Sequence, residues 1–159
     1  MQDFDIIEGL DNMQMDAVMA LLKTTHWASK RPEQQERLAM EHSFCYGARC
    51  RETGRQIAFA RVVTDYGTTY YLCDVVVDPS WQHKGVGRAL LEAIEETPLF
   101  RDLRGILVSR DAQPFYAKFG FEKSDRGMVK PAKESQLVYL KSGLLFSTAG
   151  SKSNHFESI

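Results

Sequence analysis

Apolar residues recur at helical spacing in two segments near the start of the chain. Between residues 13 and 23 the apolar side chains fall on one helical face, and Asp11 or Asn12 is available as the N-cap. A second helix is expected over residues 33–40, because Pro32 precedes it and proline is tolerated in a first helical turn. The chain is therefore predicted to form two helices before its first strand.

Three strand-like runs follow, over residues 43–50, 56–64 and 70–77. Short segments with turn-forming residues separate them, so we expect antiparallel neighbours in one sheet. After Pro79 the apolar period changes to that of a helix, which is expected over residues 86–96.

The next segments are shorter. A strand is expected over residues 105–109, a short helix over 114–118 and a further strand over 122–129. The predicted order is thus α-α-β-β-β-α-β-α-β, which favours an α/β (α+β) domain with a mixed, mostly antiparallel sheet. We assign this domain to residues 1–134.

Residues 135–159 are interpreted as a C-terminal extension. Its apolar part, Leu137 to Phe146, could form a strand or a helix, and the rest is Ser-rich and polar. The apolar part needs burial, either against the core of its own chain or against a second copy in a homodimer.

Charge and cysteine content limit the range of possible functions. The 20 Lys and Arg residues nearly balance 21 Asp and Glu residues, so no basic field favours nucleic acid as a partner. The three cysteines, Cys45, Cys50 and Cys73, form no CxxC pair, so we expect buried reduced thiols and no metal site.

The first residues carry acids where a secretion signal would carry bases, at Asp3, Asp5 and Glu8. No apolar stretch approaches the roughly 18 residues that cross a bilayer. We therefore expect a cytoplasmic protein with no membrane partner.

The chemistry is expected where a strand runs through a Pro turn into a helix, from Val75 to Leu91. Gly85 and Gly87 stand at the helix start, where backbone N–H groups have no partner within the helix and the helix dipole is positive. A diphosphate is a natural ligand of such a start, and Lys84 and Arg88 can add charged hydrogen bonds.

The spacing of the glycines distinguishes between three kinds of phosphate-binding loop. A P-loop needs GxxxxGK followed by Ser or Thr, and the sequence holds no such run. A dinucleotide fingerprint needs a third glycine where Leu90 stands, and a parallel sheet. The pattern that remains is Gln82-x-x-Gly85-x-Gly87.

With this motif the sequence resembles the GNAT superfamily of acyl-CoA-dependent N-acyltransferases. A second segment, residues 112–121, is also similar to the family, and the likeness covers about residues 4 to 130. The resemblance implies helices on both faces of the sheet and two strands splayed around a bound acetyl-CoA. Many relatives carry Asn where Ser109 stands, which affects one cofactor contact. The cofactor-binding residues that it implies are Val75, Val76, Val77, Gln82, His83, Lys84, Gly85, Val86, Gly87, Arg88, Ser109, Phe115 and Lys118.

Acyl transfer to an amine needs a proton for the leaving thiolate and a neutral amine. The resemblance implies that Tyr116 is the acid, and a phenol with a pKa near 10 is protonated at neutral pH. Asp74 interrupts an apolar strand, where a carboxylate is expected only if it is paired with a positive group or has a function. It could take the proton of the amine or hold its ammonium, or it could form a structural salt bridge with Arg61.

The family likeness also suggests Trp27, Arg31 and Ser43 as the acceptor pocket, because the segment between the first two helices usually covers that site. The expected function is N-acetylation of a small-molecule primary amine by direct attack on acetyl-CoA. Two alternatives stay open: acetylation of a protein lysine or N-terminus, and a non-catalytic CoA-binding sensor or interaction module.

Overall fold

The sheet contains five strands, and the computed structural model describes residues 3–132. Their order in space is their order in the chain, β1-β2-β3-β4-β5. The neighbours are antiparallel except β4 and β5, which are parallel. The strands are β1 (Phe4–Glu8), β2 (Phe44–Cys50), β3 (Gln56–Thr64), β4 (Thr69–Val77) and β5 (Arg104–Ile106).

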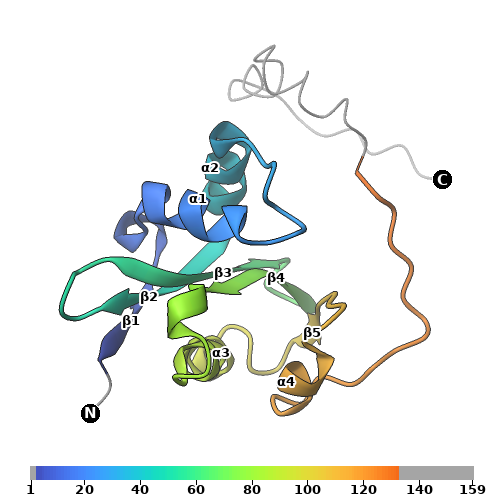
Figure 1. Ribbon diagram of the computed structural model, residues 1–159. Coiled ribbons are helices and arrows are strands. Elements are labelled where there is room, and N and C mark those ends of the chain that lie inside the picture. Colours follow the sequence, from blue (N-terminus) through green and yellow to red (C-terminus); the bar gives the residue numbers. More distant parts are fainter. Residues whose placement is uncertain (1–2, 133–159) are drawn as a thin grey trace, which may run out of the picture. The chain divides into compact units, whose positions relative to one another are not determined.

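Helices cover both faces of the sheet (Figure 1). One face carries α1 (Met15–Lys23) and α2 (Glu33–Glu41), and the other carries α3 (Val86–Glu96) and α4 (Gln113–Ala117). Short 3-10 helices precede α1 at Leu10–Asn12 and α3 at Pro79–Trp81. The mixed fold with helices on both faces is therefore confirmed.

Side-chain alternation along the strands divides the core in two. Phe59 and Val76 are buried against α1 and α2, together with Leu22 and Met40. The opposite face packs its side chains against α3, whose buried residues include Leu90, Leu91 and Ile94. Apolar burial of this kind is the main term that stabilises a domain of this size.

The first strand is the main feature that the sequence interpretation missed. Phe4–Glu8 pairs with β2, and only Phe4 of its five residues is fully buried. An edge strand in which two of five residues are acids has a weak apolar signal. The segment Glu122–Val129, in contrast, was expected to be a strand and forms none. Its polar run with turn-forming residues offers no buried face, and Met128 is fully exposed.

Element ends differ from the predictions in two places. The N-cap of α1 is Gln14, not Asp11 or Asn12, because those two residues form the 3-10 helix and the Asn12 amide donates to the Glu8 carbonyl at 2.7 Å. The strand expected over residues 105–109 is shorter and ends at Ile106.

Residues 126–132 are exposed and carry no helix or strand. The C-terminal extension proposed for residues 135–159, with its apolar segment, lies outside the described residues.

Candidate acyl-transfer site

The loop between β4 and α3 holds two residues in left-handed backbone conformation. Asp78 begins the loop, and its carboxylate accepts a hydrogen bond from the Ser80 N–H at 2.8 Å. His83 has φ 61° and Gly85, the N-cap of α3, has φ 84°. Gly85 suits this conformation because it carries no Cβ. The two left-handed turns direct the chain abruptly from the strand into the helix.

The start of α3 leaves its backbone donors available. The Ala89 N–H bonds to the Gly85 carbonyl at 3.0 Å, as the first bond of the helix. Among residues 3–132, the N–H groups of Val86, Gly87 and Arg88 have no acceptor. Such a cluster of donors at the positive end of a helix fits a diphosphate.

Space beside Gly87 supports the same interpretation. A Cβ on Gly87 would lie 3.6 Å from both the Phe115 ring and the Val77 side chain, so any larger side chain would fill the hollow between them. The geometry therefore fits the diphosphate of coenzyme A at residues 85–88.

The side chains of the loop contribute less than its backbone. Lys84 lies over the Trp81 ring, with its ammonium 4.9 Å from the ring centre. Arg88 is paired with Glu92 at 2.6 Å on an exposed face. Gln82 donates to the Val77 carbonyl at 3.3 Å, and His83 is exposed.

Beside this loop, β4 and β5 separate. Their paired residues end at Tyr71 and Ile106. Beyond that point β4 continues to Val77, still paired with β3, and no strand within the described chain pairs with its other edge. The predicted splay is present, and it leaves backbone groups of Val75 to Val77 available to an extended ligand.

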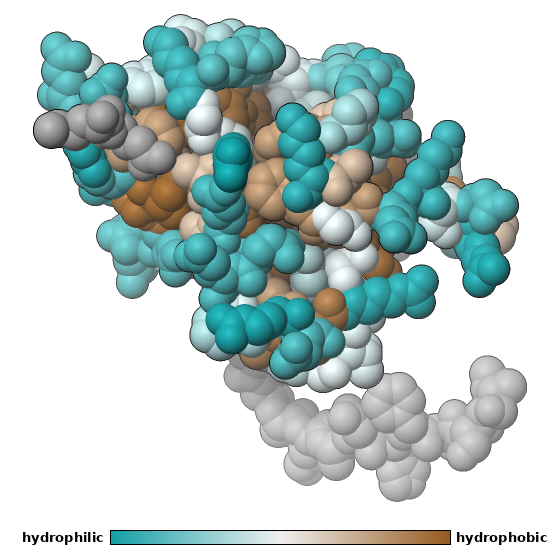
Figure 2. All heavy atoms as spheres, turned by 90° about the horizontal axis from the view of Figure 1, so that it is seen from below, coloured by the Kyte–Doolittle hydropathy of each residue, from teal (hydrophilic) through white to brown (hydrophobic). Residues whose placement is uncertain are grey.

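Helix α4 forms a wall of the same region. A pocket of about 380 Å³ is lined by Arg88 and Glu92 of α3 and by Phe115, Lys118 and Phe119 in and just after α4. Figure 2 views the molecule from this side, where hydrophilic residues surround hydrophobic ones. The structure thus brings the predicted residues Arg88, Phe115 and Lys118 together. Ser109 accepts a hydrogen bond from the Ala112 N–H at 3.1 Å at the start of α4.

Tyr116 is the buried residue of α4. Its ring packs near Phe115 and Phe121, with centroid distances of 5.2 Å and 6.1 Å. Burial raises the pKa of Tyr116 to about 12. No other described residue shares a hydrogen bond with its hydroxyl, which is therefore a protonated phenol with its donor unused.

Asp74 lies at a bulge in β4, on the face that carries α1 and α2. Cys73 is paired with Arg61 and Val76 with Phe59, so Asp74 and Val75 together stand opposite a single residue of β3. Asp74 has φ 55°, which is unusual for a residue with a side chain. The bulge turns the Asp74 carboxylate to the same face as Cys73, where it is buried.

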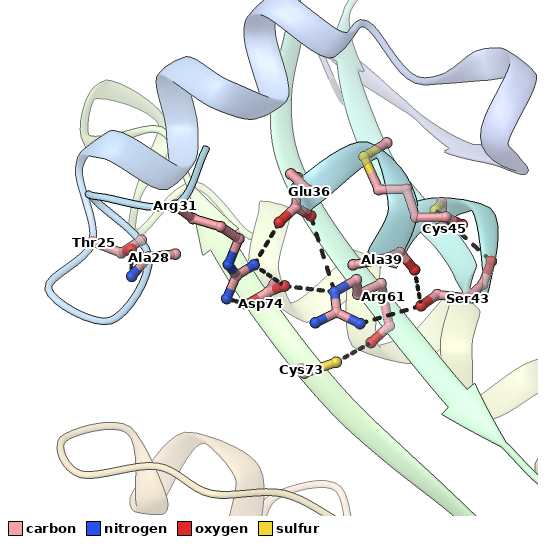
Figure 3. A network of polar contacts seen from close by, with 11 residues as sticks. Thr25, Ala28, Arg31, Glu36, Ala39, Ser43, Cys45, Arg61, Cys73 and Asp74 are labelled. Carbon is pink, nitrogen blue, oxygen red and sulfur yellow. Dashed lines mark hydrogen bonds and ion pairs between the residues drawn. The ribbon is translucent and has the colours of Figure 1, made fainter. Parts of the chain in front are cut away.

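Two arginines hold that carboxylate (Figure 3). Arg31 donates to both oxygens, at 2.7 Å and 3.1 Å, and the Arg61 Nε donates to Oδ2 at 2.6 Å. Burial raises the pKa of Asp74, but the hydrogen bonds from Arg31 and the charge of Arg61 outweigh it and hold the pKa below its usual value. The structural salt bridge with Arg61 is present, and a carboxylate so engaged is a poor base.

Sequence reasoning missed one member of this cluster, Glu36 of α2. It is completely buried, and its Oε2 accepts from Arg31 Nη1 at 2.5 Å. Its Oε1 has no hydrogen bond within residues 3–132 and lies 4.0 Å from the Arg61 Nε. A signal existed, because Glu36 and the buried Met40 are one helical turn apart on the same face.

The predicted acceptor residues are only partly brought together. Arg31 and Ser43 belong to the cluster, since Ser43 accepts from Arg61 Nη1 at 3.2 Å. Trp27 does not belong to it: the side chain is half exposed and packs against His26, with ring centroids 5.0 Å apart. Within the described residues no group of His, Cys, Asp and Glu is placed to hold a metal, and no helix could span a membrane.

The comparison with known proteins agrees with this geometry. The family model described as acetyltransferase (GNAT) domain matches residues 41–123, which is more than half of the chain. The chain belongs to the GNAT family. A solved GNAT-family structure from Xanthomonas campestris pv. campestris is 31% identical, with a TM-score of 0.77, and the match covers 83% of this chain and 95% of that one.

Curated relatives of this GNAT protein carry different acetyltransferase names. A histone acetyltransferase from Glycine max is 36% identical, over 52% of this chain and 37% of the relative. A chloroplastic serotonin N-acetyltransferase from Oryza sativa subsp. japonica is 38% identical, over 58% of this chain and 48% of the relative. The matched regions thus span less than half the length of these relatives. An aminoglycoside N-acetyltransferase solved with coenzyme A shares the fold, with a TM-score of 0.63 at 19% identity.

Proposed function

We propose that this GNAT protein transfers an acetyl group from acetyl-CoA to a primary amine of a small molecule. The observation that carries the proposal is the row of backbone donors at the start of α3, next to the splay between β4 and β5. Family membership supports acetyl transfer in general, whereas the choice of a small amine is part of the proposal.

Coenzyme A, when bound, supplies the acetyl group as a thioester. Residues 85–88 would hold its diphosphate through their N–H groups, and the unpaired edge of Val75 to Val77 would align its extended arm. A backbone N–H on that edge would stabilise negative charge on the acyl oxygen, an effect of roughly 3 kcal/mol in comparable sites.

Tyr116 would protonate the departing sulfur as the C–S bond breaks, and its phenolate would regain the proton that the newly acylated nitrogen loses. Its hydroxyl lies on the α3 and α4 face, and its raised pKa keeps the proton in place at neutral pH. The base role considered for Asp74 is not part of the proposal, because both oxygens of Asp74 already accept hydrogen bonds from guanidinium groups. We assign Asp74 to positioning instead.

The test is a screen of amines for release of free thiol from acetyl-CoA, with the acetylated product identified by mass. The panel includes aromatic ethylamines, polyamines, amino acids and a lysine peptide, because one relative is named a histone acetyltransferase. Turnover of the peptide alone would show a protein acetyltransferase. Tight coenzyme A binding without any thiol release would show a sensor.

Tyr116→Phe tests the acid. We expect kcat to fall by about 10²-fold to 10⁴-fold with coenzyme A affinity unchanged. Tyr66→Phe is the matched control, because Tyr66 is an exposed tyrosine of the β3–β4 turn. An unchanged kcat in Tyr116→Phe would remove the acid assignment.

A further inference from the structure

The buried ion cluster presents arginine, not carboxylate, to an approaching molecule. The side chains of Glu36 and Asp74 are 0% and 3% exposed, while those of Arg31 and Arg61 are 18% and 15% exposed. Both oxygens of Asp74 are taken by arginine N–H groups. A substrate that reaches this cluster therefore meets hydrogen-bond donors with positive charge.

Arg61 keeps donors that no described residue uses. Its Nε donates to Asp74, and its Nη1 donates once, to Ser43. Its Nη2 has no acceptor within residues 3–132, and Figure 3 shows this nitrogen without a dashed line. A guanidinium with a free edge is suited to a planar oxyanion, which it can bind through two parallel N–H groups.

The cluster lies beside the proposed reaction centre. Arg61 is paired with Cys73, and Asp74 directly precedes Val75, which lies on the edge of β4 that β5 leaves unpaired. A ligand on Arg61 would therefore be next to the end of the acyl carrier that is remote from the diphosphate loop.

A partly exposed apolar row, not covered by any helix of the described residues, continues from Arg61 on the same face of the sheet. Val63 is paired with Tyr71, and Tyr71 with Ile106. These three residues are 39%, 39% and 43% exposed, although Val63 and Tyr71 lie on the inner strands β3 and β4. Val63 is two residues from Arg61, so the apolar row and the guanidinium share one surface.

We propose that the acceptor amine carries an oxyanion, bound by Arg61, and an apolar body that lies on Val63, Tyr71 and Ile106. An apolar α-amino acid has this chemistry: an amine, an adjacent carboxylate and an apolar side chain. The proposal rests on the proposed function, because it names the substrate class of the same site. A phosphonate or phosphate beside the amine would present the same oxyanion chemistry.

The test compares amines that differ in the oxyanion alone. Phenylalanine, phenethylamine and the aminophosphonate analogue of phenylalanine are assayed for thiol release, and their binding to the coenzyme A complex is measured by calorimetry. We expect kcat/KM and affinity at least 10-fold higher for one of the oxyanion-bearing amines, and which one is preferred identifies carboxylate or phosphonate. Equal or better use of phenethylamine would overturn the proposal.

Arg61→Lys tests the residue, because it keeps the charge and loses the planar edge. KM for the preferred amine is expected to rise about 10-fold to 100-fold, and KM for phenethylamine, which lacks the oxyanion, by a smaller factor. Arg37→Lys is the matched control, since Arg37 is exposed and pairs only with Glu33 of the same helix in the described structure. Equal KM changes for both amines in Arg61→Lys would overturn the assignment.

The comparison on the unaltered protein keeps the test decisive even if Arg61→Lys fails to fold. Failure of the proposed function has a different signature: no amine in any class releases thiol. The calorimetric arm would then still decide whether an oxyanion binds at Arg61.

Discussion

Removal of the Asp74 charge is the sharpest probe of the ion cluster. Asp74→Asn keeps the size of the side chain but replaces one oxygen by an NH₂ group that faces guanidinium donors. The carboxylate is almost fully buried and accepts three hydrogen bonds from Arg31 and Arg61. The substitution therefore leaves two partly buried positive groups with a single buried carboxylate, that of Glu36.

The expected cost follows from that geometry. Breaking a buried ion pair by removing one partner costs about 3–5 kcal/mol. Both arginines keep limited contact with solvent, which screens part of the loss, so we expect the lower end, about 3 kcal/mol. For a domain of this size such a loss lowers Tm by roughly 10 °C.

The assay is urea and thermal unfolding at pH 7, followed by tryptophan fluorescence. Asp5→Asn is the matched control, because Asp5 pairs with Arg51 on the surface and is 57% exposed. We expect no measurable shift in the control. A midpoint for Asp74→Asn equal to that of Asp5→Asn would refute the view that the cluster stabilises this part of the fold.

The pH dependence gives a second readout of the same residue. The pKa of Asp74 is lower in the folded chain than its usual value of 3.8, so its stabilising effect is present above that value. It is lost as the pH falls through the lower native pKa. The difference in unfolding free energy between the natural chain and Asp74→Asn should therefore narrow below pH about 4, and a difference independent of pH would contradict the linkage.

Three further results are expected. Gly87→Trp should abolish coenzyme A binding in calorimetry, because its side chain would fill the hollow between Phe115 and Val77, and retained binding would contradict the assignment of the loop. Gly105→Ala should lower the free energy of unfolding in urea by about 1–3 kcal/mol, because its Cβ would lie 2.6 Å from the Tyr70 hydroxyl; Gly127→Ala, where a Cβ meets nothing, is the control. The raised pKa of Tyr116 predicts a contribution to stability that is complete below pH about 10 and lost as the pH rises toward 12, so Tyr116→Phe should remove part of the alkaline loss seen in unfolding.

Much of the fold follows from local pattern. The amphipathic segments over α1, α2 and α3 and the meander of β2, β3 and β4 have strong periodic signals, and the structure confirms them. The edge strand β1 lacks such a signal because two of its five residues are acids and it depends on pairing with β2. The strand expected over residues 122–129 is absent, since no partner strand gives it a buried face within the described chain.

The candidate site, too, could be predicted from the sequence only in part. The two glycines and the Pro turn identify the start of α3, because the backbone conformation required there favours glycine. The sequence gives no comparable signal for the bulge at Asp74, since its positive φ is imposed by the surrounding sheet and by two arginines from other elements. The helical face that Glu36 shares with Met40 indicates that Glu36 is buried, but its partners, Arg31 and Arg61, lie outside its helix and could not be assigned from that segment.

The division of the core by the sheet has a consequence for how such a protein can change. The residues that bury α3 and those that bury α1 and α2 lie on opposite sides of the strands. Under the proposed function, substitutions in the loop between α1 and α2 would change the acceptor side, where Arg31 lies, and would leave the proposed diphosphate loop at the start of α3 unaltered. Selection could then act on the acceptor and on the proposed acetyl donor separately, and a laboratory library confined to residues 24–32 would vary the acceptor side of the proposed site without changing residues 85–88.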